Sequence, residues 1–135
     1  MKKLGFGCMR FPLLDPEDPT SVDLNQVKAM VDLFLKRGFT YFDTAWFYHQ
    51  GTSEGVVKQA LVGRYPRDRF TLADKMPLSM LKDKTKEDQE QTFRTQLERC
   101  GVDYFDFYLL HNVTAESYQT AQRLDTFAYL LEQKE

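Results

Sequence analysis

Two kinds of segment, which differ in their pattern of hydrophobic and polar residues, alternate along this chain. Short, nearly continuous apolar runs are followed by turns, and the turns lead into longer segments with apolar residues three or four positions apart. The first pattern is typical of strands buried on both faces, and the second of amphipathic helices. We expect strands over residues 3–11, 39–45, 69–75 and 103–111, and helices over residues 23–38, 53–63, 87–100 and 115–134.

Capping residues and apolar stripes support the expected helices. Asp23 and Gln26 have the spacing of a capping box, Ser53 is the expected N-cap of the second helix, and Gly38 and Gly63 follow the ends of these two helices. The apolar stripe of the first helix contains Leu24, Val27, Met30, Val31, Phe34 and Leu35. The stripe of the last helix contains Tyr118, Ala121, Leu124, Phe127 and Leu131.

The regular spacing of these elements predicts the fold class. Strands that begin near residues 4, 40, 70 and 105 define βα units of about 30 to 36 residues, the size found in parallel α/β proteins. Four units make either a small doubly wound sheet or half of a TIM-type (β/α)8 barrel, and a whole barrel needs about 250 residues. The 135 residues end in the last turn of an expected helix, so we expect a truncated barrel in a single domain over residues 1–135.

Composition excludes several classes of protein. Eighteen basic against 20 acidic residues give a net charge of −2, which leaves no excess of Lys and Arg for a nucleic-acid backbone. No apolar run approaches the roughly 18 residues that cross a bilayer. Two cysteines without metal-site spacing favour a reducing cytoplasm, and two isolated histidines give no support for a metal site.

Four residues with chemical potential fall near the expected carboxyl ends of strands. Asp43 and Lys75 lie at or near the ends of the second and third strands, His111 ends the fourth, and Tyr48 follows Asp43 by five positions. In parallel α/β proteins, ligands bind at this edge of the sheet. Each residue alone is better explained by packing or solvation, but their recurrence at equivalent points of three consecutive units indicates a shared site.

These residue types together can protonate a carbonyl oxygen. A phenol has a reference pKa near 10, so a tyrosine acid needs a nearby ammonium that favours its phenolate, and Lys75 is the candidate. Asp43 would keep Lys75 charged, and His111 would hydrogen-bond the substrate oxygen. A Schiff-base aldolase that uses Lys75 is a weaker alternative, because the Asp partner retains the proton that a nucleophilic amine must lose.

Several segments resemble the aldo-keto reductase family: "LGFGCMRFP", "GFTYFDTAWFYHQGTSEG", "LADKMP" and "LERCGVDYFDFYLLHNV". The resemblance implies the first four units of a (β/α)8 barrel that binds NADPH or NADH and reduces a small aldehyde or ketone. It implies that Asp43, Tyr48, Lys75 and His111 form the catalytic tetrad. It further implies cofactor contacts from Gly7, Cys8, Met9 and Asp43, and a substrate cleft lined by Trp46, Tyr48 and His111.

Two further expectations concern cofactors and partners. The opening "LGFGCMRFP" is similar to a subgroup of that family with a cysteine-rich iron-sulfur segment at its far C-terminus, but such cysteines do not occur here, so we expect no cluster in this chain. A non-catalytic half-barrel is the alternative to an enzyme. Exposed edges of the first and fourth strands would then favour association of two copies.

Overall fold

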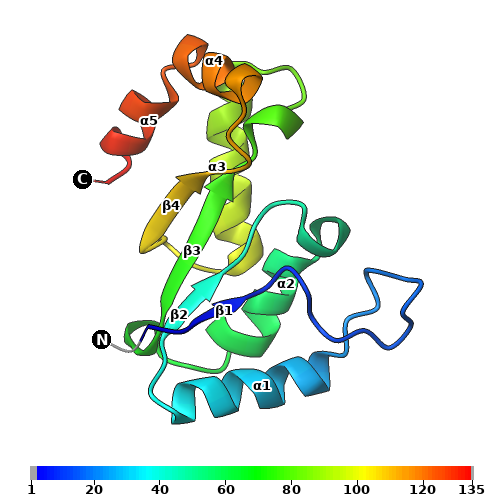
Figure 1. Ribbon diagram of the computed structural model, residues 1–135. Helices are drawn as coiled ribbons and strands as arrows, with labels where there is room; N and C mark the ends of the chain where they lie inside the picture. The colour runs from blue at the N-terminus through cyan, green and yellow to red at the C-terminus, as the bar shows by residue number, and fades with distance from the viewer. Residues whose placement is uncertain (1–2, 135) are drawn as a thin grey trace.

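The computed structural model describes residues 3–134, whose four strands form one parallel sheet. The strands are β1 (Gly5–Gly7), β2 (Tyr41–Asp43), β3 (Thr71–Met76) and β4 (Phe107–Leu110). Each strand pairs with the next one along the chain, so β1 and β4 are the edges of the sheet (Figure 1). This sequential order matches half of a (β/α)8 barrel, because a doubly wound sheet reverses its strand order.

Among residues 3–134, five α-helices accompany the sheet: α1 (Leu24–Lys36), α2 (Ser53–Val57), α3 (Lys86–Cys100), α4 (Ala115–Arg123) and α5 (Thr126–Glu132). A π-helical turn over Lys58–Val62 extends α2, so the helix expected over 53–63 is present in two geometries. Short 3-10 turns occur at Tyr48–Gly51, Arg67–Arg69 and Leu78–Met80. In Figure 1, α1, α2 and α3 lie on one side of the sheet, whereas α4 and α5 extend beyond the upper ends of β3 and β4.

Successive side chains along each strand point to opposite faces of the sheet, and the two faces differ in burial. Phe42 and Leu72 point toward the helices and are buried, with exposed fractions of 1% and 0%. Residues next to them point to the opposite face, where Phe107 and Leu109 are 52% and 41% exposed. The face that would line a barrel interior is therefore open in this chain.

Aromatic rings dominate the larger of two hydrophobic clusters. Phe42 of β2 contacts Phe34 of α1 and Phe6 of β1, with ring centroids 5.1 and 5.3 Å apart. These contacts join the first two units through rings that each bury a large apolar area. A smaller cluster forms where α4 meets the end of β3, from Met76, Leu78, Leu81, Ala121 and Leu124.

The first two helices confirm one predicted cap, correct the other, and correct one residue of the predicted apolar stripe. The carboxylate of Asp23 accepts a hydrogen bond from the backbone N–H of Gln26 at 3.0 Å, as expected for an N-cap. Ser53 is not the cap of α2, because Thr52 precedes the helix and the hydroxyl of Ser53 points into the interior instead. Met30 lies at the margin of the α1 stripe and is 39% exposed rather than buried.

The prediction of one continuous helix over residues 115–134 is wrong. The chain forms α4 and α5, separated at Asp125, whose backbone is left-handed with φ of 52°. Thr126 is buried beside the break, and its hydroxyl donates to the side chain of Gln89 in α3 at 2.5 Å. Of the expected stripe, Ala121 and Leu124 are buried and Tyr118 is 45% exposed, whereas Phe127 and Leu131 beyond the break are 48% and 65% exposed.

The observed strands are shorter than the apolar runs that predicted them. The first expected strand extends over residues 3–11, for example, but β1 ends at Gly7 and leads into a long connection to α1 that projects from the body of the structure (Figure 1).

Among residues 3–134, no helix has both the length and the apolar composition that crossing a bilayer requires.

Candidate functional site

The carboxyl ends of β2 and β3 bring a lysine and an aspartate together. Asp43 ends β2, and Lys75 is the penultimate residue of β3 on the same open face of the sheet. The Lys75 Nζ donates to Asp43 Oδ1 at 2.6 Å and to the backbone oxygen of Thr44 at 2.6 Å. Backbone hydrogen bonds fix the neighbouring chain: the N–H of Cys8 donates to the backbone oxygen of Asp43 at 2.8 Å, and the N–H of Thr44 donates to the backbone oxygen of Ala73 at 3.0 Å.

Lys75 is held as a charged ammonium. Burial alone would lower its pKa, but the hydrogen bond and charge of Asp43, with a smaller contribution from Tyr48, raise the pKa of Lys75 above its usual value. An ammonium has three donors, and two of them are used by Asp43 and Thr44. The third is available to Tyr48. A permanently protonated lysine is a poor amine nucleophile, so the geometry disfavours the Schiff-base alternative.

Tyr48 and His111 complete the cluster. The Lys75 Nζ lies 4.8 Å from the centroid of the Tyr48 ring, and the ring of His111 meets the Tyr48 ring edge to face with centroids 5.7 Å apart. Burial lowers the pKa of His111, and the nearby Lys75 charge lowers it further. The imidazole is therefore neutral near pH 7 and offers one N–H donor.

His49 fixes the turn that carries Tyr48. His49 and Gln50 both have left-handed backbones, with φ of 52° and 53°. The two ring nitrogens of His49 bind the connection between β1 and α1: Nε2 accepts from Phe11 N–H at 2.9 Å, and Nδ1 lies 2.8 Å from the backbone oxygen of Pro19. The ring also stacks on Phe11. The sequence pattern gave no indication of this anchoring role.

The expected cofactor residues at the end of β1 lie beside Asp43. A Cβ added to Gly7 would meet nothing within 4 Å, and Met9 is 57% exposed, so both border an open surface. Cys8 has the opposite orientation, because its thiol is 1% exposed and faces the core. Burial raises the pKa of the Cys8 thiol far above its usual value, so this thiol stays neutral.

Trp46 and the surface near His111 differ from the simplest expectation. The ring of Trp46 stacks against the guanidinium of Arg99 in α3, with 4.0 Å from the guanidinium carbon to the ring centroid. The ring of Trp46 therefore packs on a helix. A hollow beside the tetrad is lined instead by Pro77, Ser79, Met80, His111 and Asn112. Of these residues, only His111 was expected at the site from the sequence.

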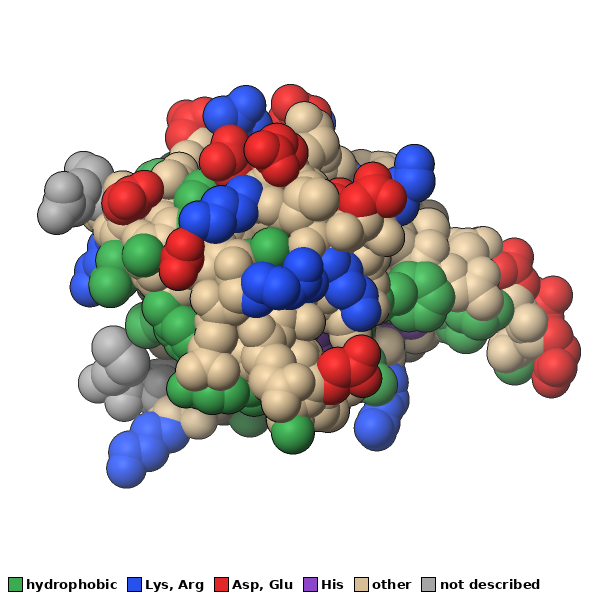
Figure 2. Space-filling model, turned by 90° about the horizontal axis from the view of Figure 1, so that it is seen from above, with side chains coloured by type: hydrophobic (Ala, Val, Ile, Leu, Met, Phe, Trp, Pro, Cys, Tyr) green, Lys and Arg blue, Asp and Glu red, His purple; other side chains and the backbone are tan. Residues whose placement is uncertain are grey.

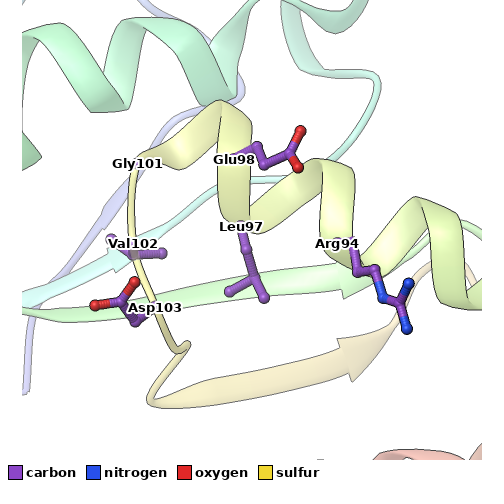
Figure 3. Close-up of a pocket in the computed structure, with 6 residues that line it drawn as sticks. All are labelled: Arg94, Leu97, Glu98, Gly101, Val102 and Asp103. Atoms are coloured by element: carbon purple, nitrogen blue, oxygen red, sulfur yellow. The ribbon is translucent and has the colours of Figure 1, made fainter.

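Acidic and basic side chains both occur on the face shown in Figure 2. The figure, seen from above, shows a group of basic side chains near the middle and acidic side chains at the end of the projecting segment. A separate pocket lies between the last turns of α3 and the chain that leads to β4, where Leu97 points toward the sheet (Figure 3). No member of the tetrad lines that pocket.

Buried polar residues behind the tetrad were missed by the sequence analysis. Thr44, Glu54, Asp74 and Gln96 are each 0% exposed, although each carries a polar or charged side chain. The signal for Asp74 was present in the sequence, because a carboxylate occurs within an otherwise apolar strand next to Lys75. Gln96 had no such signal, because it lies in a helix whose sequence is polar on most sides.

Comparison with known proteins decides the family. The profile of the aldo/keto reductase family matches residues 3–135, nearly the whole chain. The chain belongs to the aldo/keto reductase family. A probable aldo-keto reductase of Glycine max is 30% identical over an alignment of 124 residues that covers 84% of this chain and 33% of that protein. An uncharacterised oxidoreductase of Bacillus subtilis is 27% identical over an alignment of 123 residues that covers 86% of this chain and 37% of that protein. This family member thus spans about a third of the length of these curated relatives.

Solved structures of the family confirm the half-barrel. The holo form of an aldo-keto reductase from Bacillus halodurans matches with a TM-score of 0.64 and 29% identity, over 91% of this chain and 42% of that one. An aldo-keto reductase from Klebsiella pneumoniae, solved in complex with NADPH, matches with a TM-score of 0.62 and 27% identity, over 89% of this chain and 40% of that one. The four strands of this chain therefore correspond to less than half of either structure.

Proposed function

We propose that the protein carrying this chain reduces aldehydes or ketones to alcohols at the expense of NADPH or NADH. The observation that carries this proposal is the joined set of Asp43, Tyr48, Lys75 and His111 at three neighbouring strand ends. The Lys75 ammonium is bonded to Asp43 and lies over the Tyr48 ring, and the His111 ring meets the Tyr48 ring edge to face. Such a set provides a proton donor and an oxygen-binding donor within one cluster.

In this proposal Tyr48 is the general acid. The bound dihydronicotinamide supplies the hydride. Tyr48 gives its hydroxyl proton to the carbonyl oxygen, and Lys75 stabilises the phenolate that remains through its opposite charge. Asp43 keeps Lys75 protonated and oriented by their 2.6 Å hydrogen bond. The neutral His111 donates its N–H to the same carbonyl oxygen as negative charge develops there.

The residues at the cofactor side fit a nicotinamide nucleotide in part. Gly7 and Met9 border an open surface at the end of β1, and the second Asp43 oxygen, which is not bonded to Lys75, could accept from a ribose hydroxyl. Cys8 would contribute through its backbone, because its thiol is buried. Trp46 would contribute to the substrate cleft through the part of its ring that does not pack on Arg99.

The accompanying proposals on setting follow from composition. We propose a cytoplasmic location, since Cys8 and Cys100 are free, buried thiols. We propose no nucleic-acid partner, because the chain has no basic excess. We also propose that its residues bind neither a metal nor an iron-sulfur cluster, since both cysteines lie in the core.

A labelled cofactor tests the proposed reaction. NADPH with deuterium in both hydrogen positions of the reactive carbon is mixed with the protein that carries this chain and with a panel of small aldehydes and ketones. We expect the alcohol product to carry the deuterium at the former carbonyl carbon. Consumption of NADPH without transfer of the label, or no NADPH-dependent alcohol from any substrate, would contradict the proposed function.

A non-catalytic, self-associating half-barrel is the second candidate, and the open sheet favours it. The edges of β1 and β4 are unpaired, and Phe107 and Leu109 are exposed on the inner face. A second copy could pair its β4 with β1 and its β1 with β4, which would close eight parallel strands. We expect sedimentation to detect a dimer. Phe107→Asp should weaken this dimer, whereas Leu33→Asp, which changes a 54% exposed residue of α1, should not. A monomer at all concentrations would exclude this candidate.

A further inference from the structure

A second acidic pair lies behind Lys75, on the opposite face of β3. The side chain of Asp74 points toward α2 and α3, and Glu54 at the start of α2 reaches the same place. Both side chains are 0% exposed. Neither belongs to the tetrad, so the burial of two carboxyl groups at this position requires another explanation.

One amide nitrogen joins the two carboxyl groups to the Lys75 backbone. Gln96 Nε2 lies 3.0 Å from Asp74 Oδ1, 3.1 Å from Glu54 Oε1 and 3.0 Å from the backbone oxygen of Lys75. The backbone N–H of Lys75 donates to Asp74 Oδ1 at 2.8 Å. Asp74 and Glu54 thus each have a carboxyl oxygen within 3.1 Å of the same nitrogen.

The charges around the pair do not balance if both groups are ionised. Arg99 donates to Glu54 Oε2 at 3.3 Å, and the ion pairs formed by residues 3–134 include none to Asp74. The Lys75 ammonium lies on the other face of the strand, bonded to Asp43. One cation therefore faces two fully buried carboxyl groups, and a second buried anion without a partner is strongly unfavourable.

The remaining titratable groups at this place are neutral. The Cys100 thiol lies 3.8 Å from Asp74 Oδ2, and the Tyr108 hydroxyl donates to Gln96 Oε1. Burial raises the pKa of both groups above their usual values, so neither supplies a charge near pH 7. Neither group can offset a second carboxylate.

We infer that Asp74 and Glu54 share one proton at neutral pH, with Asp74 as the carboxylic acid that donates to the Glu54 carboxylate. Asp74 is thereby a positioning residue for Lys75, a role that rests on the proposed function of Lys75. The N–H of Lys75 is held by Asp74 and its C=O by Gln96. The peptide groups on both sides of the lysine are thus fixed from the interior while its ammonium faces the site.

The electrostatics agree with this placement of the proton. Burial raises the pKa of Asp74 well above its usual range, and the charge of Glu54 raises it further. Burial also raises the pKa of Glu54, but Gln96 and Arg99 act in the opposite direction. Glu54 is therefore the group that ionises first.

Carbon-13 NMR of the carboxyl groups tests the shared proton directly. The 135-residue chain is labelled in its Asp and Glu side chains and compared with Asp74→Asn and with Asp103→Asn, which changes an exposed aspartate. We expect one Asp signal at the carboxylic-acid position at pH 7, absent only from Asp74→Asn. If every Asp signal of the wild-type chain is at the carboxylate position, the inference is overturned, whether or not the variant folds.

The backbone amide of Lys75 tests the positioning role. Its NMR signal should shift together with the titration of the Asp74 carboxyl, stay near its wild-type position in Asp74→Asn, and move in Asp74→Leu, which cannot accept the hydrogen bond. A Lys75 amide that is indifferent to Asp74 would remove this role. Neither measurement uses NADPH or a carbonyl compound, so its failure is distinct from failure of the proposed reaction.

Discussion

At the scale of single residues, the proposed proton transfer depends on a charged Lys75. Its side chain is only 12% exposed, and its ammonium bonds Asp43 at 2.6 Å. Lys75→Met removes the charge that stabilises a Tyr48 phenolate and leaves Asp43 without its partner. We expect kcat for carbonyl reduction to fall about 10²-fold or more. Lys82→Met, at an exposed position, should leave kcat unchanged, and equal rates for both variants would contradict the role of Lys75.

His111 gives a prediction for stability against pH. Burial lowers its pKa in the folded state, so the unfolded chain binds a proton first as the pH falls below the unfolded pKa of about 6.5. The contribution of this histidine to stability is then lost progressively toward lower pH. We expect His111→Gln to reduce the fall in the urea midpoint between pH 7.5 and about pH 5. An unchanged fall would show that His111 titrates as an ordinary exposed histidine.

The sequence predicted the positions of Asp43, Lys75 and His111 because strand ends follow from hydrophobic runs and turns. It did not predict that Trp46 stacks on Arg99 or that His49 anchors Phe11. Those contacts join residues far apart in the sequence, and local pattern contains no information about such pairs. The catalytic role of the four residues remains the proposal made above.

At the scale of elements, local signals predicted helix starts better than helix continuity. The cap at Asp23 was visible in the sequence because it depends on residues three positions apart. The break at Asp125 depends on two contacts with α3. The hydroxyl of Thr126 donates a buried hydrogen bond to Gln89, and Asp125 forms a 2.5 Å ion pair with Lys86. Contacts with α3 therefore end α4 where the apolar spacing alone would continue the helix.

The α1 cap gives a matched pair of variants. Asp23→Ala removes the acceptor for the Gln26 N–H, and we expect the free energy of unfolding to fall by about 1 kcal/mol. Asp23→Asn keeps an acceptor oxygen and should stay close to the wild-type value. Urea denaturation of both variants measures the difference. Equal losses would show that the carboxylate charge, and not the hydrogen bond, stabilises this helix.

At the scale of the whole molecule, the βα spacing predicted the half-barrel, and the strand order confirms it. The outward-facing residues of β2 and β3 are buried under helices and Phe6 of β1 is partly buried, but the inner face has no covering layer among residues 3–134. The tetrad lies at the upper margin of that open face. The chain thus has a complete set of proposed acid and orienting residues on a sheet with two free edges.

The rate of carbonyl reduction by the Tyr48→Phe variant decides whether Tyr48 is the proton donor. The variant is made in the protein that carries this chain and compared with Tyr104→Phe, which removes a hydroxyl at a 50% exposed position away from the site. We predict that Tyr48→Phe lowers kcat by about 10²–10⁴-fold while Tyr104→Phe retains the parent rate. Parent rates for Tyr48→Phe across a broad panel of aldehydes and ketones would contradict its assignment as the proton donor.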